Sequence, residues 1–385
     1  MGRHAVRTAM AFDFVDEIVV ADRDGERAAS FADQCGDRAA SAQVDVENTG
    51  ALDALLSGAD VVLNTVGPFY RLGVPVLRAA IDAGCHYFDI NDDWEPTLEM
   101  LILDDEARKA GITAVIGIGA SPGISNLLAV KAMNELDTIE DLITGWSFAG
   151  EVESGAMEGG RGTGSEAKAP SAALVHWMHQ CSGKIRVFRE GRFVDMAPIE
   201  EMYAEVPGVA RGAVWSVGHP EAVTLPRFRG GIRNCHNVMT GPRWIIDAVR
   251  DLAAQIDAGT LTAFQAAQLL LDPAADAASR RSAETEPPGQ PRLPPLFASA
   301  NGTRNGKPAS VGSMVLGAPA GGMGGATGIP LAVALSLFAE GKIDRRGVSA
   351  PETAIDPDTF FDALAPLCSP PLTGARDMVL VNTSA

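Results

Sequence analysis

The feature that most constrains the fold is a pair of short apolar segments joined by a helix-forming stretch. Residues 61–63 form an apolar run that leads into the turn Gly67–Pro68, and a second strand-like segment, centred on Tyr87 and Phe88, follows at 86–90. A helix is expected between them over 74–83. It would have a proline in its first turn and a glycine just after its end, the positions where these residues are favoured in helices. Strand–helix–strand units build parallel sheets, which bind ligands at the carboxyl ends of their strands. We therefore expect an α/β fold with its active site at that edge.

The length, net charge and cysteine pattern of the chain limit the classes of function that it could have. A chain of 385 residues exceeds one ordinary core, so two domains are expected. The net charge of −18 would repel a nucleic-acid backbone and an anionic lipid surface, so neither is an expected partner. The sequence has no signal-peptide core and no apolar run near the roughly 20 residues that span a bilayer. Its five cysteines form no C-x-x-C pair, so we expect free thiols, no metal site and a cytoplasmic protein.

The N-terminus begins abruptly with a helical pattern. Gly2 precedes this pattern, and a strand from residue 17 ends at Asp22. This spacing is typical of a dinucleotide-binding fingerprint, in which the third glycine of G-x-G-x-x-G opens a helix and an acidic residue follows about 20 positions later. We expect a first strand and two glycines, about ten residues, to be missing upstream. The alternative is that Gly2 is an ordinary residue near a terminus.

Several strand ends carry residues suited to a dinucleotide. Asp22 would accept hydrogen bonds from ribose hydroxyls, which favours NAD, and Arg23 beside it would admit the 2′-phosphate of NADP. Asp45, at the end of a strand expected over 42–46, is predicted near the adenine. Downstream, a strand over 113–118 opens into 119–126 and a helix over 127–134, where Pro and Gly form a modest anion site at the helix N-terminus.

These motifs resemble the saccharopine dehydrogenase-like NAD(P)-dependent oxidoreductases, which include saccharopine reductases, lysine 6-dehydrogenases and carboxynorspermidine dehydrogenases. The resemblance rests on three motifs in the first 130 residues and returns near the C-terminus. They are Asn64-Thr65-Val66-Gly67-Pro68-Phe69, Gly84-x-x-Tyr87-x-Asp89, Gly119-x-Ser121-Pro122-Gly123-x-Ser125-Asn126, and the later Gly328-Ile329-Pro330 and Gly347-Val348-x-x-Pro351-Glu352.

The resemblance implies a fold and a set of site residues. A Rossmann-type doubly wound parallel sheet, lacking its first strand, is expected over 1–130 and completed by 325–368. A second α+β domain, 131–324, would build a mostly antiparallel sheet for substrate binding and dimerisation, and 369–385 would form a tail. The predicted cofactor-binding residues are Gly2, Arg3, Asp22, Arg23, Asp45, Asn64, Thr65, Val66, Gly67, Pro68 and Asn91. The predicted substrate-binding residues are Phe69, Tyr70, Gly119, Ser121, Pro122, Gly123, Asn126 and Arg229.

Several further residues are open to two interpretations. Asp93 is well placed for proton transfer or could cap the next helix, and His219 could shuttle a proton or bond to a turn. Arg229, with Arg227 and Arg233 around a Gly-Gly turn, could bind a carboxylate or be ordinary surface charge. The glycine-rich segment 159–165 is a loop over the active site or a plain loop. His176 and His179 have metal-ligand spacing but no carboxylates around them, so no metal is predicted.

The predicted function is hydride transfer between NAD or NADP and a carbon bonded to nitrogen in an amino acid or amine-derived substrate. The resemblance implies this chemistry and a homodimer. One alternative is an enzyme with the same cofactor domain that acts on C–O or C=C bonds. Another is a non-catalytic or inactive nucleotide-binding protein, because the phosphate-binding loop is incomplete.

Overall fold

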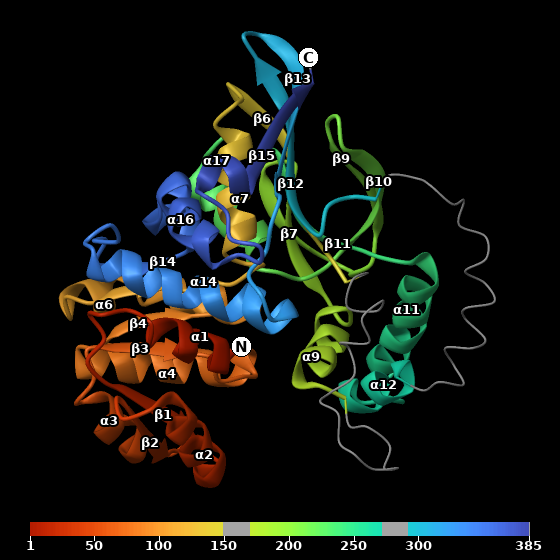
Figure 1. Cartoon of the computed structure of the whole chain (residues 1–385). Coiled ribbons are helices and arrows are strands. Elements are labelled where there is room, and N and C mark those ends of the chain that lie inside the picture. The colour runs from red at the N-terminus through yellow and green to blue at the C-terminus, as the bar shows by residue number, and fades with distance from the viewer. Residues whose placement is uncertain (149–169, 272–291, 385) are drawn as a thin grey trace. The chain divides into compact units, whose positions relative to one another are not determined.

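The computed structural model describes residues 1–148, 170–271 and 292–384 (Figure 1). The chain divides into two compact units. Unit 1 comprises Met1–Val130 and Leu316–Leu380, and unit 2 comprises Lys131–Val315 and Val381–Ala385. The chain thus returns to unit 1 at Leu316, ahead of the predicted residue 325. The predicted tail is corrected as well, since 369–385 contains helix α17, Ala375–Met378, and strand β15, Val379–Ser384.

Unit 1 contains two parallel sheets. Strands β1, Ile18–Asp22, and β2, Ala39–Gln43, form a pair. The other sheet has the order β14-β5-β4-β3, with strands Gly347–Ser349, Thr113–Val115, His86–Asp89 and Val61–Asn64. Among the described residues no strand precedes helix α1, Gly2–Ala9, and none pairs with the second edge of β1 or β3. The predicted Rossmann-type α/β fold is confirmed.

Helices connect these strands in the order expected of parallel sheets. Asp24 caps α2 by accepting a hydrogen bond from the Arg27 amide, and Asn48 caps α3 in the same way. Figure 1 shows α4 along the four-stranded sheet. Besides α1 and α17, whose bounds are given above, the helices of unit 1 are α2 Gly25–Cys35, α3 Thr49–Leu56, α4 Phe69–Ala83, α5 Trp94–Ile102, α6 Asp104–Lys109, α7 Ile124–Met133 (which crosses into unit 2), α14 Gly322–Ala339, α15 Pro351–Ala354, α16 Pro357–Leu364 and the 3-10 turn η1 Ala365–Leu367.

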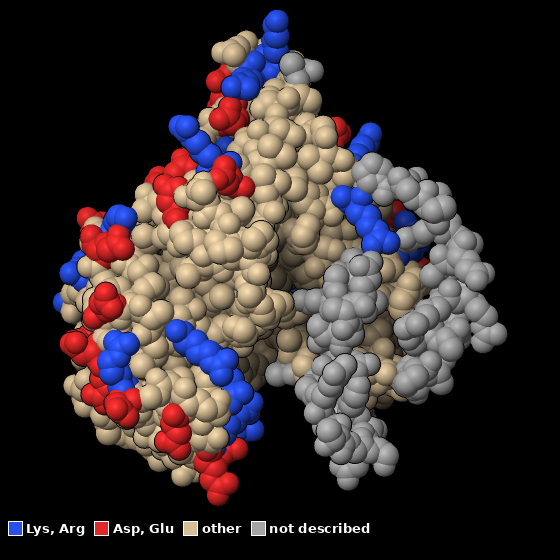
Figure 2. Space-filling view, in the orientation of Figure 1, with Lys and Arg blue, Asp and Glu red and all other residues tan. Residues whose placement is uncertain are grey.

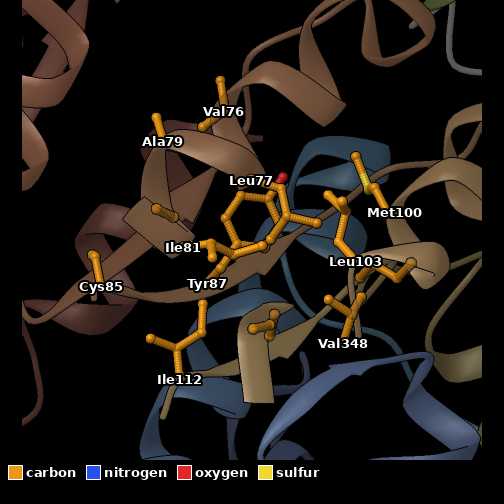
Figure 3. Close-up of a cluster of buried hydrophobic side chains, with 14 of the residues drawn as sticks. Val76, Leu77, Ala79, Ile81, Cys85, Tyr87, Met100, Leu103, Ile112 and Val348 are labelled. Carbon is orange, nitrogen blue, oxygen red and sulfur yellow. The ribbon is translucent and has the colours of Figure 1, made fainter. Parts of the chain in front are cut away.

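A single apolar cluster fills the space between the four-stranded sheet and α4, α5 and α6. It includes Leu77, Tyr87, Met100 and Leu103, all fully buried or nearly so. Figure 3 shows the Tyr87 ring inside this cluster. Burying such side chains contributes about 1.5–3 kcal/mol each, so this cluster holds the strand ends of unit 1 in place.

Helix α14 is long and apolar enough to cross a membrane by length and composition alone. Within unit 1, however, residues such as Leu331, Ala332 and Leu337 are fully buried, and Phe338 contacts the rings of His86 and Phe88 on β4. A core helix that is apolar on all sides passes the same test, so this helix is weak evidence for a membrane span.

Unit 2 is built on one large sheet. Over the described residues it has nine strands in the order β15-β13-β12-β6-β11-β10-β9, with β7 on β11 and β8 on β7. Strands β6 and β11 pair in parallel, whereas the pairs β9–β10, β10–β11, β6–β12, β12–β13 and β7–β8 are antiparallel, which confirms a mostly antiparallel α+β unit. The strands are β6 Thr138–Ser147, β7 Ile185–Arg189, β8 Arg192–Met196, β9 Glu201–Val206, β10 Ala210–Ser216, β11 Asn234–Thr240, β12 Leu296–Arg304 and β13 Lys307–Val315; the helices are α9 Ala172–Gln180, α10 Glu221–Phe228, α11 Arg243–Asp257 and α12 Ala263–Leu270.

Some predicted elements were misplaced for identifiable reasons. Helix α4 begins at Phe69, because Pro75 lies inside the helix rather than in its first turn. The strand predicted over 42–46 lies at 39–43, and Val44 and Val46 pack against the unit 1 core after the strand has ended. Gly117, with a φ of 75°, turns the chain after β5, so this strand is shorter than 113–118.

Candidate functional site

Four loops of unit 1 emerge from the same edge of its larger sheet. Strands β3, β4, β5 and β14 are parallel, so their carboxyl ends coincide. Asn64, the last residue of β3, pairs in register with Asp89, the last residue of β4. This edge is where parallel α/β sheets bind ligands, and it carries most of the predicted site residues.

The loop after β3 is fixed by its first residue. The Asn64 side chain accepts a hydrogen bond from the Val66 amide at 3.0 Å and donates one to the Tyr87 hydroxyl at 2.9 Å. Gly2, at the start of α1, lies against this loop, since a Cβ there would approach Thr65 Oγ1 to 2.7 Å. The structure therefore brings together two parts of the predicted cofactor site that lie more than 60 positions apart in the chain.

The loop after β4 is a buried polar network. Asp93 Oδ2 accepts a hydrogen bond from the Tyr70 amide at 2.9 Å, and Asn91 Nδ2 donates to the Asp93 carbonyl at 3.2 Å and to Thr97 Oγ1 at 2.7 Å. Asp93 precedes α5 but makes no side-chain capping bond to it. Its carboxylate instead holds the start of α4, so neither the capping interpretation nor a freely placed general base describes it.

The loop after β5 requires glycine. Gly123 has a φ of 118°, and a Cβ there would lie 2.2 Å from the Gly119 carbonyl oxygen. The Gly119 amide donates to the Pro122 carbonyl at 2.9 Å, and the Gly123 amide donates to Asn126 Oδ1 at 2.9 Å. Asn126 Nδ2 in turn donates to Glu352 Oε2 at 2.8 Å. The C-terminal return of the chain thus braces the predicted substrate loop from within unit 1.

Helices α1 and α2 carry a group of arginines. Arg3 and Arg7 lie over the Phe31 ring, at 4.7 Å and 5.6 Å from its centroid. Arg27 is one helical turn before Phe31 on α2, which places it on the same face. Figure 2 shows Lys and Arg side chains gathered over this part of unit 1. Among the described residues, none of Arg3, Arg7, Arg23 and Arg27 has a carboxylate within 4.0 Å, although the chain carries a net charge of −18.

Unit 2 holds the other predicted catalytic residue, His219. Its side chain is 5% exposed, and Nδ1 lies 3.6 Å from Oε2 of the fully buried Glu221. The Trp146 ring lies 5.8 Å from the imidazole, centre to centre, and Trp146 Nε1 donates to Asn237 Oδ1 at 3.2 Å. A buried carboxylate beside a histidine is an arrangement that orients an imidazole for proton transfer.

Comparison with known proteins identifies the family. Residues 1–115 match the model of the saccharopine dehydrogenase NADP binding domain. This part of the chain is therefore similar to a saccharopine dehydrogenase NADP-binding domain. An alignment of 119 residues is 33% identical to saccharopine dehydrogenase [NADP(+), L-glutamate-forming] from Saccharomyces cerevisiae, covering 31% of this chain and 25% of that protein. An alignment of 77 residues is 38% identical to the human saccharopine dehydrogenase-like oxidoreductase, covering 20% of this chain and 18% of that protein.

The fold similarity extends further than the sequence similarity. The solved structure of apo histidine-tagged saccharopine dehydrogenase (L-Glu forming) from Saccharomyces cerevisiae matches with a TM-score of 0.63 at 16% identity, covering 100% of this chain and 98% of that one. The sequence alignments span about a quarter or less of the curated relatives' length. The resemblance to saccharopine dehydrogenase-like oxidoreductases is confirmed, and so is the expectation of NAD or NADP at the level of the domain family.

In this saccharopine dehydrogenase-like chain, two predicted positions have other roles. Arg229 donates to the carbonyls of Met133 and Leu136 at 2.7 Å and 3.0 Å, so it satisfies the end of α7. Arg227 stacks on Phe193 and Arg233 pairs with Glu140, so the three arginines do not converge on a carboxylate site. Asp45 lies beyond the end of β2, where it accepts the Glu47 amide in a turn before α3.

Sequence reasoning missed five residues that contribute to the site. Tyr87 and Asp89 appeared only as motif residues, and Glu352 appeared only as part of a returning motif. Arg27 and Phe31 were not considered, although their spacing of four on a helix could have shown that they share a face. The glycine-rich segment 159–165 lies outside the described residues.

Proposed function

We propose that this chain is an NADP-preferring oxidoreductase that transfers a hydride at a carbon–nitrogen bond of an amino acid or amine-derived substrate. The observation that carries the cofactor preference is the group of arginines around α1 and α2. Arg3, Arg7, Arg23 and Arg27 have no carboxylate within 4.0 Å among the residues that the structure describes, and in so acidic a chain such guanidinium groups suit a phosphate ligand. The relatives' names support the reaction, because they are NADP(+)-dependent saccharopine dehydrogenases.

Different residues of unit 1 would contact different parts of the bound cofactor. Asp22 Oδ1 accepts the Asp24 amide at 3.0 Å, and no described residue donates to its second oxygen, which we assign to a ribose hydroxyl. Arg23 and Arg27, with Arg3 from α1, would hold the 2′-phosphate. Gly2 and the loop Thr65–Pro68 would contact the half of the cofactor that lies away from the adenosine ribose. When bound, the nicotinamide would supply or accept the hydride.

A proton must also move when an amine is oxidised or an imine is reduced. We assign this proton to His219, whose imidazole lies beside the buried Glu221 carboxylate. Histidine is the commonest residue in this role. Asp93 is the alternative, but its carboxylate already holds the Tyr70 amide, so we assign it a positioning role in the loop after β4.

Cofactor titration followed by a substrate panel tests this proposal. The purified chain is titrated with NADPH and NADH, with nicotinamide fluorescence as the readout, and binding of NADPH is expected to be at least tenfold tighter. With NADP⁺, saccharopine and lysine are then compared with simple secondary alcohols. Turnover of an amine supports the C–N assignment, turnover of alcohols alone favours the C–O alternative, and binding without turnover favours a non-catalytic protein. Failure to bind either nucleotide overturns the oxidoreductase proposal.

We also propose that the protein is a cytoplasmic homodimer. The family resemblance motivates the dimer, and sedimentation or light scattering of the purified chain measures it directly. A monomer at micromolar concentration would contradict it.

A further inference from the structure

One buried carboxylate ties together three loops of the candidate site. Asp89 Oδ1 accepts hydrogen bonds from the Gly117 amide at 2.6 Å and the Asn91 amide at 3.0 Å. Its backbone carbonyl accepts the Ile118 amide at 2.8 Å. Asp89 ends β4, whereas Gly117 and Ile118 follow β5. The loops after two neighbouring strands are therefore fixed to one side chain.

The second oxygen of Asp89 extends the connection to the third loop. Tyr87 donates its hydroxyl proton to Asp89 Oδ2 at 2.7 Å, and its oxygen accepts a hydrogen bond from Asn64 Nδ2 at 2.9 Å. Asn64 Oδ1 then accepts the Val66 amide at 3.0 Å. The chain of bonds runs from Val66 through Asn64 and Tyr87 to Asp89 without a break.

We call the chain of hydrogen bonds from Val66 through Asn64 and Tyr87 to Asp89 the relay. The direction of every bond in the relay is fixed. Asp89, Tyr87 and Asn64 are at most 2% exposed, and the Tyr87 ring is held in the apolar core (Figure 3). The tyrosine hydroxyl has one proton to donate, and Asn64 presents its amino group to the same oxygen. The hydroxyl proton must therefore point to Asp89, which requires a carboxylate that accepts it.

We propose that Asp89 is a positioning residue for cofactor binding. Through Tyr87 and Asn64 it holds the loop Thr65–Pro68 in the shape that receives the dinucleotide. This inference rests on the proposed function for the location of the cofactor, but not for the relay itself.

Protonation of Asp89 would break the relay. A protonated Oδ2 becomes a donor toward Tyr87, so the tyrosine oxygen would face two donors and its own proton would have no acceptor. Burial raises the pKa of Asp89 to about 6, against the hydrogen bonds from Gly117, Tyr87 and Asn91 that favour the charged form. The charged and titratable groups facing it are Asp92, which also raises its pKa, and Tyr87, whose own pKa is raised well above its ordinary value by burial.

The decisive experiment reverses the relay. Asp89→Asn keeps an acceptor for the Gly117 and Asn91 amides but presents an amino group to Tyr87, which breaks one bond only. Adding Asn64→Asp places a carboxylate at the other end, so that Tyr87 donates to position 64 and accepts from position 89. The double variant D89N/N64D restores every bond with the opposite direction. Tyr87→Phe removes the hydroxyl group that joins Asn64 to Asp89 and serves as the comparison in which the relay is broken.

Two readouts separate positioning from a general need for a buried charge. The Kd for NADPH is measured by fluorescence, and hydrogen exchange of the 64–68 segment is measured in the cofactor-free protein. We expect Asp89→Asn and Tyr87→Phe to weaken NADPH binding at least tenfold and to speed exchange in this segment. The double variant should return to within about threefold of the parent in both.

The wild-type protein gives an independent test that needs no variant to fold. As pH falls from 7 to 5.5, the protection factor of the Val66 amide, which corrects for the intrinsic pH dependence of amide exchange, should fall. The Kd for NADPH should rise over the same range, and both changes should have a midpoint near 6. Flat profiles, or an Asp89→Asn protein that matches the wild type, overturn the inference. So does a folded double variant that behaves like the single one. If the wild type binds no nucleotide, the proposed function fails, while hydrogen exchange still decides the relay.

Discussion

Asn126 and Glu352 form a buried hydrogen bond of 2.8 Å between Nδ2 and Oε2, although 226 positions separate them in the sequence. Asn126 lies on α7 and Glu352 on α15, and both belong to unit 1. Because Asn126 also accepts the Gly123 amide, the C-terminal part of the chain stabilises the loop after β5. The returning segment is thus part of the candidate site and not only a cover for the sheet.

Glu352→Ala should destabilise unit 1. Removing the acceptor leaves a buried amide poorly satisfied, which costs about 1–3 kcal/mol. Glu352→Gln is the matched control, because its side-chain oxygen can still accept from Asn126, so a smaller loss is expected. Urea unfolding of the two variants measures the difference. Equal losses in both would show that the negative charge, and not this hydrogen bond, is what matters.

Gly123→Ala should disrupt the loop over 119–123. The new Cβ would lie 2.2 Å from the Gly119 carbonyl oxygen, at a φ of 118°, a conformation that L-residues rarely adopt. We expect at least a tenfold loss of substrate affinity together with a lower melting temperature.

Gly58→Ala is the control for this substitution, since a Cβ there would meet nothing within 4 Å and Gly58 has no positive φ. That variant should bind and melt like the wild type. A Gly123→Ala protein that matches Gly58→Ala would contradict the role assigned to the loop.

Sequence reasoning was strongest where short-range patterns decide the structure. The strand expected at 86–90 corresponds to β4, His86–Asp89. Sequence reasoning was weakest at element boundaries: residues 44–46, predicted within a strand over 42–46, follow the end of β2 at Gln43, because an apolar pattern can continue past the last residue that pairs in a sheet. The Asn64–Tyr87–Asp89 relay and the Asn126–Glu352 bond depend on which residues meet in space. Local patterns carry no information about such contacts.

Replacement of Arg23 or Arg27 should change the cofactor preference. If these guanidinium groups hold the 2′-phosphate, each substitution by alanine should weaken NADPH binding about tenfold or more, since hydrogen bonds to charged groups contribute about 1.5–3 kcal/mol. Binding of NADH should change less than twofold. Arg78→Ala is the control, because Arg78 is an exposed arginine on α4 that already lies 3.5 Å from Glu106. Equal losses for NADPH and NADH would argue against a 2′-phosphate site.

His219→Gln should lower turnover without affecting cofactor binding. A positioned acid–base group contributes about 10²–10⁴-fold to the rate, so kcat should fall by this range while the Kd for NADPH stays within twofold. Asp93→Asn is the comparison. The side-chain oxygen of the new asparagine can still accept a hydrogen bond from the Tyr70 backbone N–H, so a smaller fall in kcat is expected. A larger fall for Asp93→Asn than for His219→Gln would exchange the two assignments.

His236 should make unit 2 less stable as the medium becomes acidic. Its side chain is 4% exposed on β11, and Nε2 accepts a hydrogen bond from Arg189 Nε at 2.9 Å. Burial, with the neighbouring Arg189 charge, lowers the pKa of His236 to about 4 from an ordinary value of 6.5. Between these values the unfolded chain takes up a proton that the folded chain does not. The stabilisation is therefore complete above about pH 6.5 and is lost as pH falls toward 4, by at most about 1.4 kcal/mol per pH unit.

The matched variant is His236→Gln, whose side-chain oxygen can accept from Arg189 but does not titrate. Unfolding free energies of both proteins are measured in urea from pH 4.5 to 7.5, and the variant value is subtracted from the wild-type value. Asp89 titrates in the same range with the opposite sign, because its pKa is raised in the folded state, but its contribution is common to both proteins and cancels. The difference should be constant above pH 6.5 and should decline below it. A difference that stays constant down to pH 4.5 would show that His236 takes up its proton equally in the folded and unfolded chains.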